Sequence, residues 1–316
     1  MTLTFGSNSK TAFLFPGQGA QVVGMGLELF ERSGAAKDVF GEVDEALGRP
    51  LSKILFEGPE DELRETINAQ PGIMAVSLAC VGAMNENLDK DDIPDPVLMA
   101  GHSLGEYTAL AAAGVLSVKD AALLVQKRGQ LMQEACDSNP GTMAAILGLD
   151  EMTLEEITRE SGTFVSNINT EEQIVISGGK MAVARAMDMA SARGAKKVIP
   201  LRVGGAFHSG LMEPAKAGLI EALNNVEFVE PNVPIIGNCT AQPLKSAEEI
   251  RGELITQIAS CVQWKRSVDF MIRSGVTNFL EIGPGKALSG MVKRIDRNAN
   301  ISNISDLESI LAFSRN

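Results

Sequence analysis

Short apolar runs and amphipathic stretches follow one another along the chain. An apolar run at 11–15 leads into a Pro-Gly loop, which predicts a short buried strand. A second buried strand is expected in "DPVLMAGHS" at 95–103, ending in a tight turn. The next stretch, "LGEYTALAAAGVL" at 104–116, has helical composition and small side chains that allow close packing on a sheet.

Residues 59–88, which precede the second strand, carry two helical patterns. We expect a break between them at Pro71, because proline removes a backbone donor from a helix interior. The first pattern is acidic and predicts an exposed helix, whereas the second, "GIMAVSLACVGAM", is apolar nearly all round and predicts a buried one. A further amphipathic helix is expected at 118–136.

The pattern changes after residue 137. Apolar runs at 141–149, 163–169, 172–179 and 195–203 predict strands, and the stretches 151–162 and 180–194 predict helices. The resulting order, βαββαβ, is that of ferredoxin-like folds. We therefore predict a small subdomain at 138–203, inserted into a larger one formed by 1–137 and 204–316. The larger one resumes with a strand at 233–238 and a strand–turn–helix at 278–295.

Composition narrows the class of protein. The 316 residues are 45% hydrophobic and 22% charged, which is typical of a soluble globular chain with a large core. There is no apolar run of 18 residues and no basic-then-apolar N-terminal segment, so we expect no membrane partner and a cytoplasmic protein. The expected location would be a plastid or another organelle if a transit peptide had been removed. The net charge of −12 disfavours nucleic acid as a partner.

The cysteines and histidines are too scattered for a metal site. The four cysteines form no CxxC pair and have no histidine cluster nearby, which indicates free thiols in a reducing compartment. We expect neither a metal nor a cofactor.

The stretch "GHSLGEY" at 101–107 is the main candidate for chemistry. A serine hydroxyl needs a base within hydrogen-bond reach and donors for the oxyanion that forms. In GxSxG the glycines permit a strained turn, and strand–turn–helix is the context in which the motif carries meaning. Ser103 would then stand at the start of a helix, where the backbone N–H of Leu104 lacks an intrahelical partner.

The base must come from two histidines, His102 and His208. The side chain of His102 should point away from that of its neighbour Ser103, so His208, in the loop "GGAFHSG", is the better candidate. Acidic residues lie between Ser103 and His208 in the chain, as the catalytic acid does in α/β-hydrolases. The motif and the two histidines alone therefore do not distinguish this chain from a Ser-His-Asp hydrolase.

Five segments occur in a telling order: "FPGQGAQ" at 15–21, "GHSLGEY" at 101–107, "QKRGQLMQ" at 126–133, "GAFHSGLMEPA" at 205–215 and "EIGPGKALSG" at 281–290. Over nearly its whole length the chain resembles the malonyl-CoA:acyl carrier protein transacylases of type II fatty-acid synthases, which are related to the acyltransferase domains of polyketide synthases. The resemblance implies an α/β fold: an α/β-hydrolase-like large subdomain with a parallel sheet, plus the inserted ferredoxin-like small subdomain.

The resemblance also implies a ping-pong mechanism. Ser103 would hold the malonyl group as an ester, and His208 would move the proton in both half-reactions. By similarity a backbone carbonyl orients the histidine, and we place that carbonyl at Gln263. The backbone N–H groups of Gln18 and Leu104 would form the oxyanion hole.

Substrate selection is implied by a further set of residues. The family uses the arginine that matches Arg128 to bind the malonyl carboxylate, and a planar guanidinium suits that task. Without the resemblance, Arg128 on an amphipathic helix would be assigned to a solvated face. Phe207 matches a malonyl-selective pattern, and possible cleft-lining residues are His102, Asn167 and Asn169.

The expected partners are malonyl-CoA and the phosphopantetheine arm of acyl carrier protein, with the enzyme a monomer. An acidic carrier needs a basic surface, and two groups of basic residues could supply it or bind the phosphates of coenzyme A. Alternatives are a trans-acting malonyl acyltransferase of a polyketide synthase, a serine hydrolase or thioesterase, and, disfavoured by the full set of site residues, an inactive docking protein. The two basic groups are Lys196, Lys197 and Arg202, and Lys286, Lys293, Arg294 and Arg297.

Overall fold

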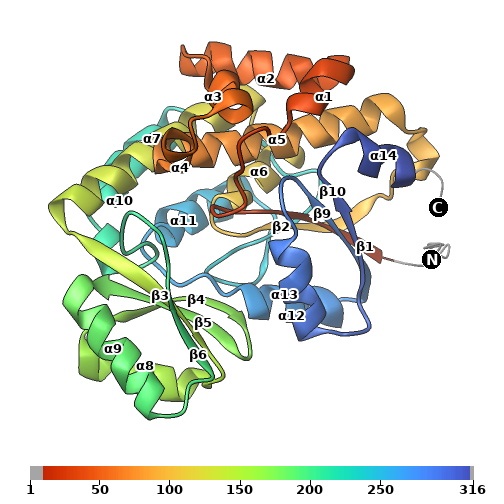
Figure 1. The fold of residues 1–316 in the computed structure, drawn as a ribbon. Helices are drawn as coiled ribbons and strands as arrows, with labels where there is room; N and C mark the ends of the chain where they lie inside the picture. The colour runs from red at the N-terminus through yellow and green to blue at the C-terminus, as the bar shows by residue number, and fades with distance from the viewer. Residues whose placement is uncertain (1–9, 314–316) are drawn as a thin grey trace.

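A computed structural model describes residues 10–313, so most of the N-terminal stretch judged to lack a secretory signal lies outside the described residues. The described chain forms a larger part around a six-stranded sheet and a smaller part around a four-stranded sheet (Figure 1). The smaller part contains residues from the middle of the chain, with the rest of the chain in the larger part. The expected α/β fold class is confirmed.

The large sheet has the order β10-β9-β1-β2-β7-β8. Its strands are parallel except for β8, which pairs antiparallel with β7. The first strand, β1, lies between β2 and β9, and its apolar side chains are buried on both faces, as parallel sheets require. The strands are β1 (Lys10–Phe15), β2 (Pro96–Gly101), β7 (Ile235–Ile236), β8 (Pro243–Leu244), β9 (Val276–Ile282) and β10 (Asn300–Ile304).

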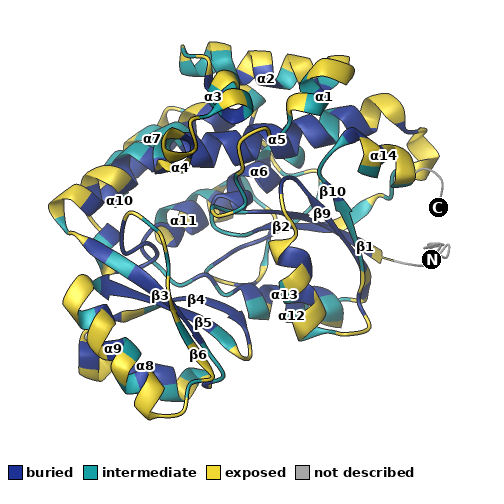
Figure 2. Ribbon diagram, in the orientation of Figure 1, coloured by how far each residue is buried: buried dark blue, intermediate teal, exposed yellow. Residues whose placement is uncertain are grey.

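Helices cover both faces of this sheet, and the burial is densest where they meet it (Figure 2). On one face α5 packs against α2 and α7. On the other, α12 and α13 cover β9. The helices of the large part are α1 (Leu27–Arg32), α2 (Gly34–Leu47), α3 (Leu51–Glu57), α4 (Glu60–Arg64), α5 (Thr66–Asn87), α6 (Gly105–Ala112), α7 (Val118–Ser138), α10 (Ala215–Asn224), α11 (Ala247–Gln257), α12 (Trp264–Arg273), α13 (Ala287–Ile295) and α14 (Leu307–Phe313), with single 3₁₀ turns η1 (Lys90–Asp92) and η2 (Gly210–Met212).

The predicted helix break at Pro71 is wrong. α5 runs from Thr66 to Asn87 with Pro71 inside it. The proline leaves the carbonyl of Ile67 without its helical donor, and the guanidinium of Arg49 donates to that carbonyl instead, at 3.1 Å. An external donor thus keeps the helix continuous. α5 is long and apolar enough to cross a membrane, but 83% of its most apolar window is buried inside the structure, as expected of a core helix.

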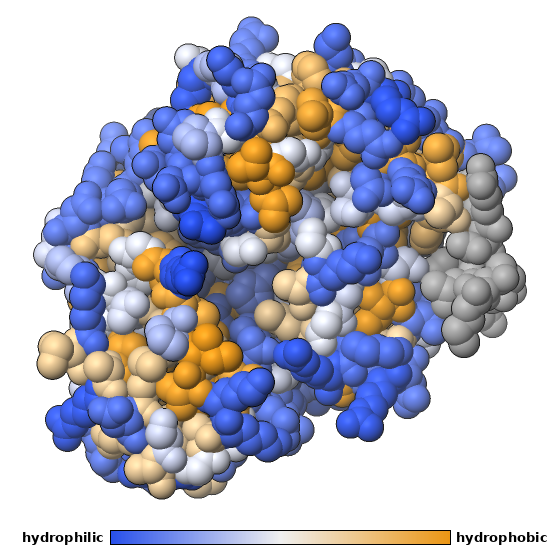
Figure 3. Space-filling model, in the orientation of Figure 1, coloured by the Kyte–Doolittle hydropathy of each residue, from blue (hydrophilic) through white to orange (hydrophobic). Residues whose placement is uncertain are grey.

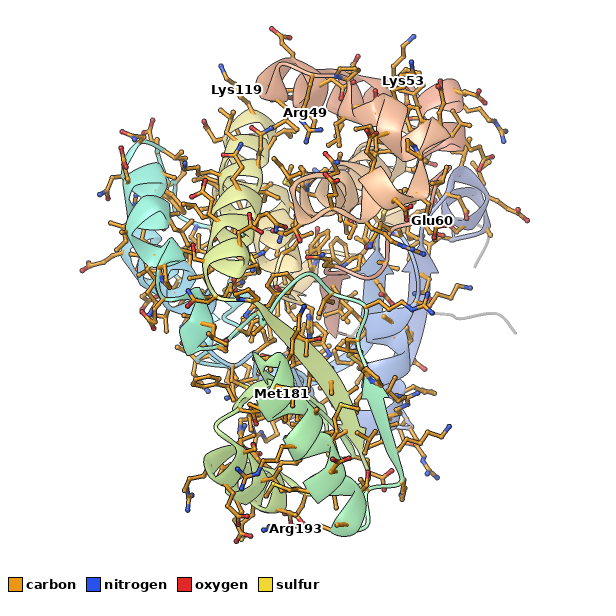
Figure 4. All side chains as sticks on the ribbon, turned by 60° about the vertical axis from the view of Figure 1, so that its left-hand side comes forward. Arg49, Lys53, Glu60, Lys119, Met181 and Arg193 are labelled. Carbon is orange, nitrogen blue, oxygen red and sulfur yellow. The ribbon has the colours of Figure 1, made fainter. Side chains whose placement is uncertain are left out.

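The small part is built from β3 (Gly141–Leu147), α8 (Glu151–Ser161), β4 (Phe164–Thr170), β5 (Gln173–Gly179), α9 (Lys180–Ala192) and β6 (Lys197–Pro200). Its antiparallel order, β4-β5-β3-β6, is the ferredoxin-like arrangement that the sequence predicts. Both helices cover one face, and in Figure 4 Met181 marks the start of α9 while Arg193 follows its end.

A short bridge joins the two parts near the site. Val262, just before α12, forms a parallel bridge to Asn167 on β4. Its amide donates to the carbonyl of Ser166, and its own carbonyl accepts from the amide of Ile168, both at 2.9 Å. This backbone pairing fixes the β4 side chains relative to the large sheet.

Candidate active site

The turn after β2 is a tight elbow that only glycines allow. A Cβ on Gly101 would lie 1.9 Å from the carbonyl of Gly105, and a Cβ on Gly105 would lie 2.1 Å from the carbonyl oxygen of Phe15. Both contacts are far below van der Waals distance. Ser103 sits between them with φ of 55°, in the left-handed region. The elbow therefore projects Ser103 away from the sheet at the start of α6.

Ser103 and His208 meet across the sequence. The Oγ of Ser103 lies 2.7 Å from Nε2 of His208, and Nδ1 of His208 lies 2.9 Å from the backbone carbonyl oxygen of Gln257. A carbonyl can only accept, so the proton resides on Nδ1. Nε2 is then free to accept the Ser103 proton. His208 also has a positive φ, 54°.

The prediction that the carbonyl of Gln263 orients the histidine is wrong, because the carbonyl of Gln257 does so. Gln263 caps the start of α12, and its carbonyl accepts from the backbone amide of Ser267 at 2.9 Å as the helix begins. Gln257 is the last residue of α11, where carbonyls lack helical partners, so its carbonyl can face His208.

Burial and a nearby cation keep His208 neutral. The residue is 4% exposed, and desolvation with the positive charge of Arg128 lowers the pKa of His208 to about 3. Near neutral pH the imidazole is therefore unprotonated and able to take a proton. Burial also lowers the pKa of His102.

Arg128 lies directly behind the serine. It projects from α7, is 0% exposed, and its Nη2 donates to the Oγ of Ser103 at 3.1 Å. Nη2 also donates to Oε1 of Gln257 at 3.0 Å, and Nη1 donates to Oε1 of Gln70 at 2.6 Å. Among the described residues its Nε has no hydrogen-bond acceptor and its guanidinium forms no ion pair with a carboxylate. The site thus holds a buried cation whose hydrogen-bond acceptors are two neutral side-chain amides and a hydroxyl, with the ring of Tyr107 5.5 Å away.

Gln257 connects three of these groups. Its backbone carbonyl accepts from His208, its Oε1 accepts from Arg128, and its Nε2 donates to the carbonyl of Ser103 at 2.7 Å. The same Nε2 donates to Oε2 of Glu106 at 2.7 Å. One residue therefore fixes the nucleophile and the cation through its side chain and the base through its backbone carbonyl.

Glu106 and Asn238 support the elbow from below. Asn238 accepts from the amide of Ser103 through Oδ1 and donates to the carbonyl of Gly101 through Nδ2, each at 2.7 Å. Glu106 is fully buried and also accepts from the amide of Asn238. Burial and the neighbouring Glu253 raise the pKa of Glu106, while hydrogen bonds from Gln257 and Asn238 oppose that rise.

The two expected oxyanion donors lie beside the serine. Leu104 follows Ser103 and is fully buried, and Gln18 lines the pocket in front of it. Within residues 10–313 neither backbone amide donates to a protein acceptor. A Cβ on Gly17 would lie 2.3 Å from the carbonyl oxygen of His102, so the glycine lets the Gln18 loop approach the elbow. Two N–H groups are thus available near Ser103.

A pocket of about 350 Å³ opens in front of Ser103, at the hollow between the two parts (Figure 3). The expected cleft residues His102, Asn167, Asn169 and Phe207 all line it. Nε2 of His102 lies 2.9 Å from Oδ1 of Asn169, so His102 turns away from the serine toward β4. Arg128 is fully buried and is absent from the described pocket lining. Met132, Met143, Val175 and Leu201 supply apolar walls.

The basic residues of the two expected groups differ in whether they line the pocket or bond to other protein groups. Arg202 lines the pocket, whereas Lys196 pairs with Glu172 at 2.8 Å and Lys293 donates to the carbonyl of Ala299. Arg294 donates to Oε1 of Gln173, which is itself a pocket residue. Among residues 10–313 there is no group of three or more metal-ligating side chains.

The comparisons with known proteins agree with this geometry. The family described as "Acyl transferase domain" matches residues 12–314. The malonyl CoA-acyl carrier protein transacylase of Bacillus subtilis is 46% identical over 96% of this chain and 95% of its own length. That of Staphylococcus aureus (strain MW2) is 38% identical over 98% and 99%.

Solved structures give the same result. The acyl-carrier-protein-S-malonyltransferase of Bartonella henselae superposes with a TM-score of 0.92 at 42% identity, covering 97% of this chain and 98% of that one. A malonyl-transacylase in complex with a type II polyketide synthase acyl-carrier protein gives 0.92 at 39%, covering 97% and 99%. The expected family is confirmed: the chain belongs to the acyl transferase domain family, among the malonyl CoA-acyl carrier protein transacylases.

Proposed function

We propose that the protein transfers a malonyl group from malonyl-CoA to the phosphopantetheine thiol of an acyl carrier protein, through an ester on Ser103. The observation that carries the proposal is the Ser103–His208 hydrogen bond of 2.7 Å, with the histidine oriented by a carbonyl. A serine activated in this way can capture an acyl group. The names of the similar proteins support the malonyl group as cargo and the carrier protein as acceptor.

In the first half-reaction the proton of Ser103 moves to Nε2 of His208 as Oγ attacks the thioester carbonyl. The oxyanion accepts hydrogen bonds from the backbone N–H groups of Leu104 and Gln18. When the intermediate collapses, the bond to sulfur breaks and the thiolate of coenzyme A takes the proton from His208. In the second half-reaction the carrier thiol gives its proton to His208 and attacks the ester, and Ser103 recovers its proton on release.

Arg128 is the proposed ligand of the malonyl carboxylate. Its guanidinium contacts the Oγ that carries the acyl group and has no carboxylate partner of its own within the described structure. A malonyl carboxylate would supply that partner, whereas an acetyl group would leave the buried cation unpaired. Phe207, which lines the pocket beside His208, would leave little room for a 2-methyl branch.

The remaining features of the proposal concern the setting. We assign 138–203 to a small subdomain that supplies one wall of the pocket through Asn167 and Asn169. The protein is proposed to act as a cytoplasmic monomer in fatty-acid synthesis. The similarity to a transacylase solved with a polyketide synthase carrier protein favours a trans-acting polyketide role as the second candidate.

The decisive experiment follows the acyl group. The protein is incubated with labelled malonyl-CoA and the malonyl ester is located by mass spectrometry, with Ser103→Ala as the negative control and Ser209→Ala as a matched serine control. Holo carrier protein is then added. Passage of label to the carrier thiol supports transfer, whereas rapid release of free malonate would identify a hydrolase. Comparing fatty-acid and polyketide carrier proteins as acceptors separates the two pathways.

A further inference from the structure

The charge of the pocket lining is opposite to that of the chain. The protein has a net charge of −12, yet the described lining contains two arginines, Arg64 and Arg202, and no aspartate, glutamate or lysine. Of the two histidines in the lining, His208 is buried and His102 is half-buried. Desolvation lowers the pKa of both, so they add no positive charge near neutral pH. The pocket is therefore locally cationic and selects for anionic ligands.

Arg202 is an available cation. It is exposed, and it forms no hydrogen bond or ion pair with any residue in 10–313. Its backbone is nevertheless anchored, because the amide of the adjacent Leu201 donates to the carbonyl of Met143 on β3 at 2.9 Å. The side chains of Leu201 and Val203 line the same pocket. A free guanidinium thus extends from a fixed strand extension at the pocket.

Arg64 approaches from the large part. It is the last residue of α4, and its side chain is 50% exposed. Glu60 holds its Nη2 at 2.5 Å, and Asp61 lies 3.7 Å from its Nη1. Figure 4 shows Glu60 on α4, in the large part and well away from Met181 on the small part. The two arginines therefore reach one pocket from separate parts of the fold. The charge of Arg64 is partly balanced by Glu60 and Asp61, whereas no carboxylate in 10–313 pairs with Arg202.

We propose that Arg202, assisted by Arg64, binds the phosphate of the phosphopantetheine arm. The inference rests on the proposed function, because both proposed substrates carry that arm. In coenzyme A the phosphate belongs to a diphosphate, and on the carrier protein it belongs to a phosphodiester. A planar guanidinium binds such oxygens through two parallel hydrogen bonds. One phosphate site would therefore serve donor and acceptor in turn, as the two substrates of a ping-pong cycle enter the same pocket.

Equilibrium binding tests the site without catalysis. Calorimetric titrations compare phosphopantetheine with pantetheine, which differ only in the phosphate, and coenzyme A with dephospho-coenzyme A, which keeps the diphosphate. Wild type should bind phosphopantetheine about tenfold more tightly than pantetheine. Arg202→Gln should abolish that difference, and should weaken coenzyme A and dephospho-coenzyme A equally. Arg185→Gln, which removes one exposed positive charge from α9, is the matched control and should retain the wild-type values.

Steady-state transfer supplies the second arm. Arg202→Gln should raise the KM for malonyl-CoA and for the holo carrier protein by similar factors, with kcat little changed. The proposal is overturned if Arg202→Gln still distinguishes phosphopantetheine from pantetheine, or if only one substrate is affected. It is equally overturned if the loss disappears with dephospho-coenzyme A, which would assign Arg202 to the 3′-phosphate. Failure of wild type to transfer malonyl would refute the proposed function while leaving the binding result intact.

Discussion

Replacing Arg128 by alanine should convert a malonyl-selective enzyme into an unselective one. The guanidinium is fully buried and touches the Oγ that carries the acyl group, so it is placed to bind a carboxylate on that group. Alanine removes the cation, and with it the hydrogen bond to Ser103 and the charge that lowers the pKa of His208. Both acyl groups feel those two losses, and only malonyl also loses its carboxylate ligand, so the ratio of the malonyl to the acetyl reaction isolates selectivity.

The size of the effect follows from the contacts. A hydrogen bond to a charged group contributes about 1.5–3 kcal/mol, and a bidentate carboxylate pair makes two of them. Part of that gain is offset, because Arg128 already bonds Gln70 and Gln257. A net loss of about 3 kcal/mol corresponds to roughly a hundredfold fall in kcat/KM for malonyl-CoA. Acetyl-CoA lacks the carboxylate and should lose only about fivefold, through the lost contact with Ser103.

The assay measures kcat/KM for malonyl-CoA and acetyl-CoA with one carrier protein. Lys127→Ala, which removes a neighbouring cation on the same helix, is the control and should keep the wild-type ratio. A circular-dichroism melt accompanies each variant, because alanine leaves the buried oxygens of Gln70 and Gln257 without their donor. A malonyl-to-acetyl ratio that stays at the wild-type value in a folded Arg128→Ala protein would refute the carboxylate role.

Three further predictions concern the supporting structure. The folded-state pKa of His208, about 3, lies below the unfolded value of 6.5. As the pH falls below about 6.5, the histidine of the unfolded state therefore binds a proton while that of the folded state stays neutral. This histidine should therefore lower the free energy of unfolding by about 1.4 kcal/mol per pH unit, and urea titrations between about pH 4.5 and 6.5 should show a shallower slope for His208→Ala. Gly105→Ala should destabilise the fold by about 2–3 kcal/mol or more, because its Cβ meets the Phe15 carbonyl, whereas Gly252→Ala, on an open helix face, should stabilise it by about 0.5–1 kcal/mol; chemical denaturation compares them. Gln257→Ala keeps the backbone carbonyl that orients His208 but loses the three side-chain contacts to Arg128, Ser103 and Glu106. Single-turnover acylation should therefore slow by roughly tenfold without being abolished, and acylation at the wild-type rate would contradict the bridging role.

The elbow and its histidine could be predicted from the sequence because local rules determine them. GxSxG between an apolar run and a helical stretch specifies a turn at Ser103, and a chain with two histidines leaves few bases to choose from. The ferredoxin-like order of the small sheet could also be predicted, because each of its strands and helices shows a recognisable pattern of hydrophobic residues. These features depend on neighbours in the chain.

The orientation of His208 depends instead on where a helix ends. Gln257 acts on His208 through its backbone carbonyl, which every residue carries, so its residue type gives no signal. The last turn of α11 leaves carbonyls without the usual donor four residues on, but which of them faces His208 is decided by tertiary packing. Asn238 was also missed, because it looked like the end of a strand, and its contact with Ser103 spans distant parts of the chain.

The helix break at Pro71 failed for a related reason. Local propensity correctly identifies a lost donor at that position. The replacement donor, Arg49, comes from the segment before α3, and no pattern within 59–88 reveals it. Long-range polar contacts thus account both for the missed site residues and for the misjudged helix.

The left-handed backbone at Ser103 restricts which nucleophiles this scaffold can accept. At a φ of 55° a side chain branched at Cβ is strongly disfavoured, whereas unbranched serine and cysteine are tolerated. Threonine has the same reactive hydroxyl, yet it would force the elbow out of the shape that Gly101 and Gly105 allow. Evolution or engineering could therefore replace Ser103 by cysteine, which brings a thiol, but not by threonine, whose hydroxyl is a secondary alcohol.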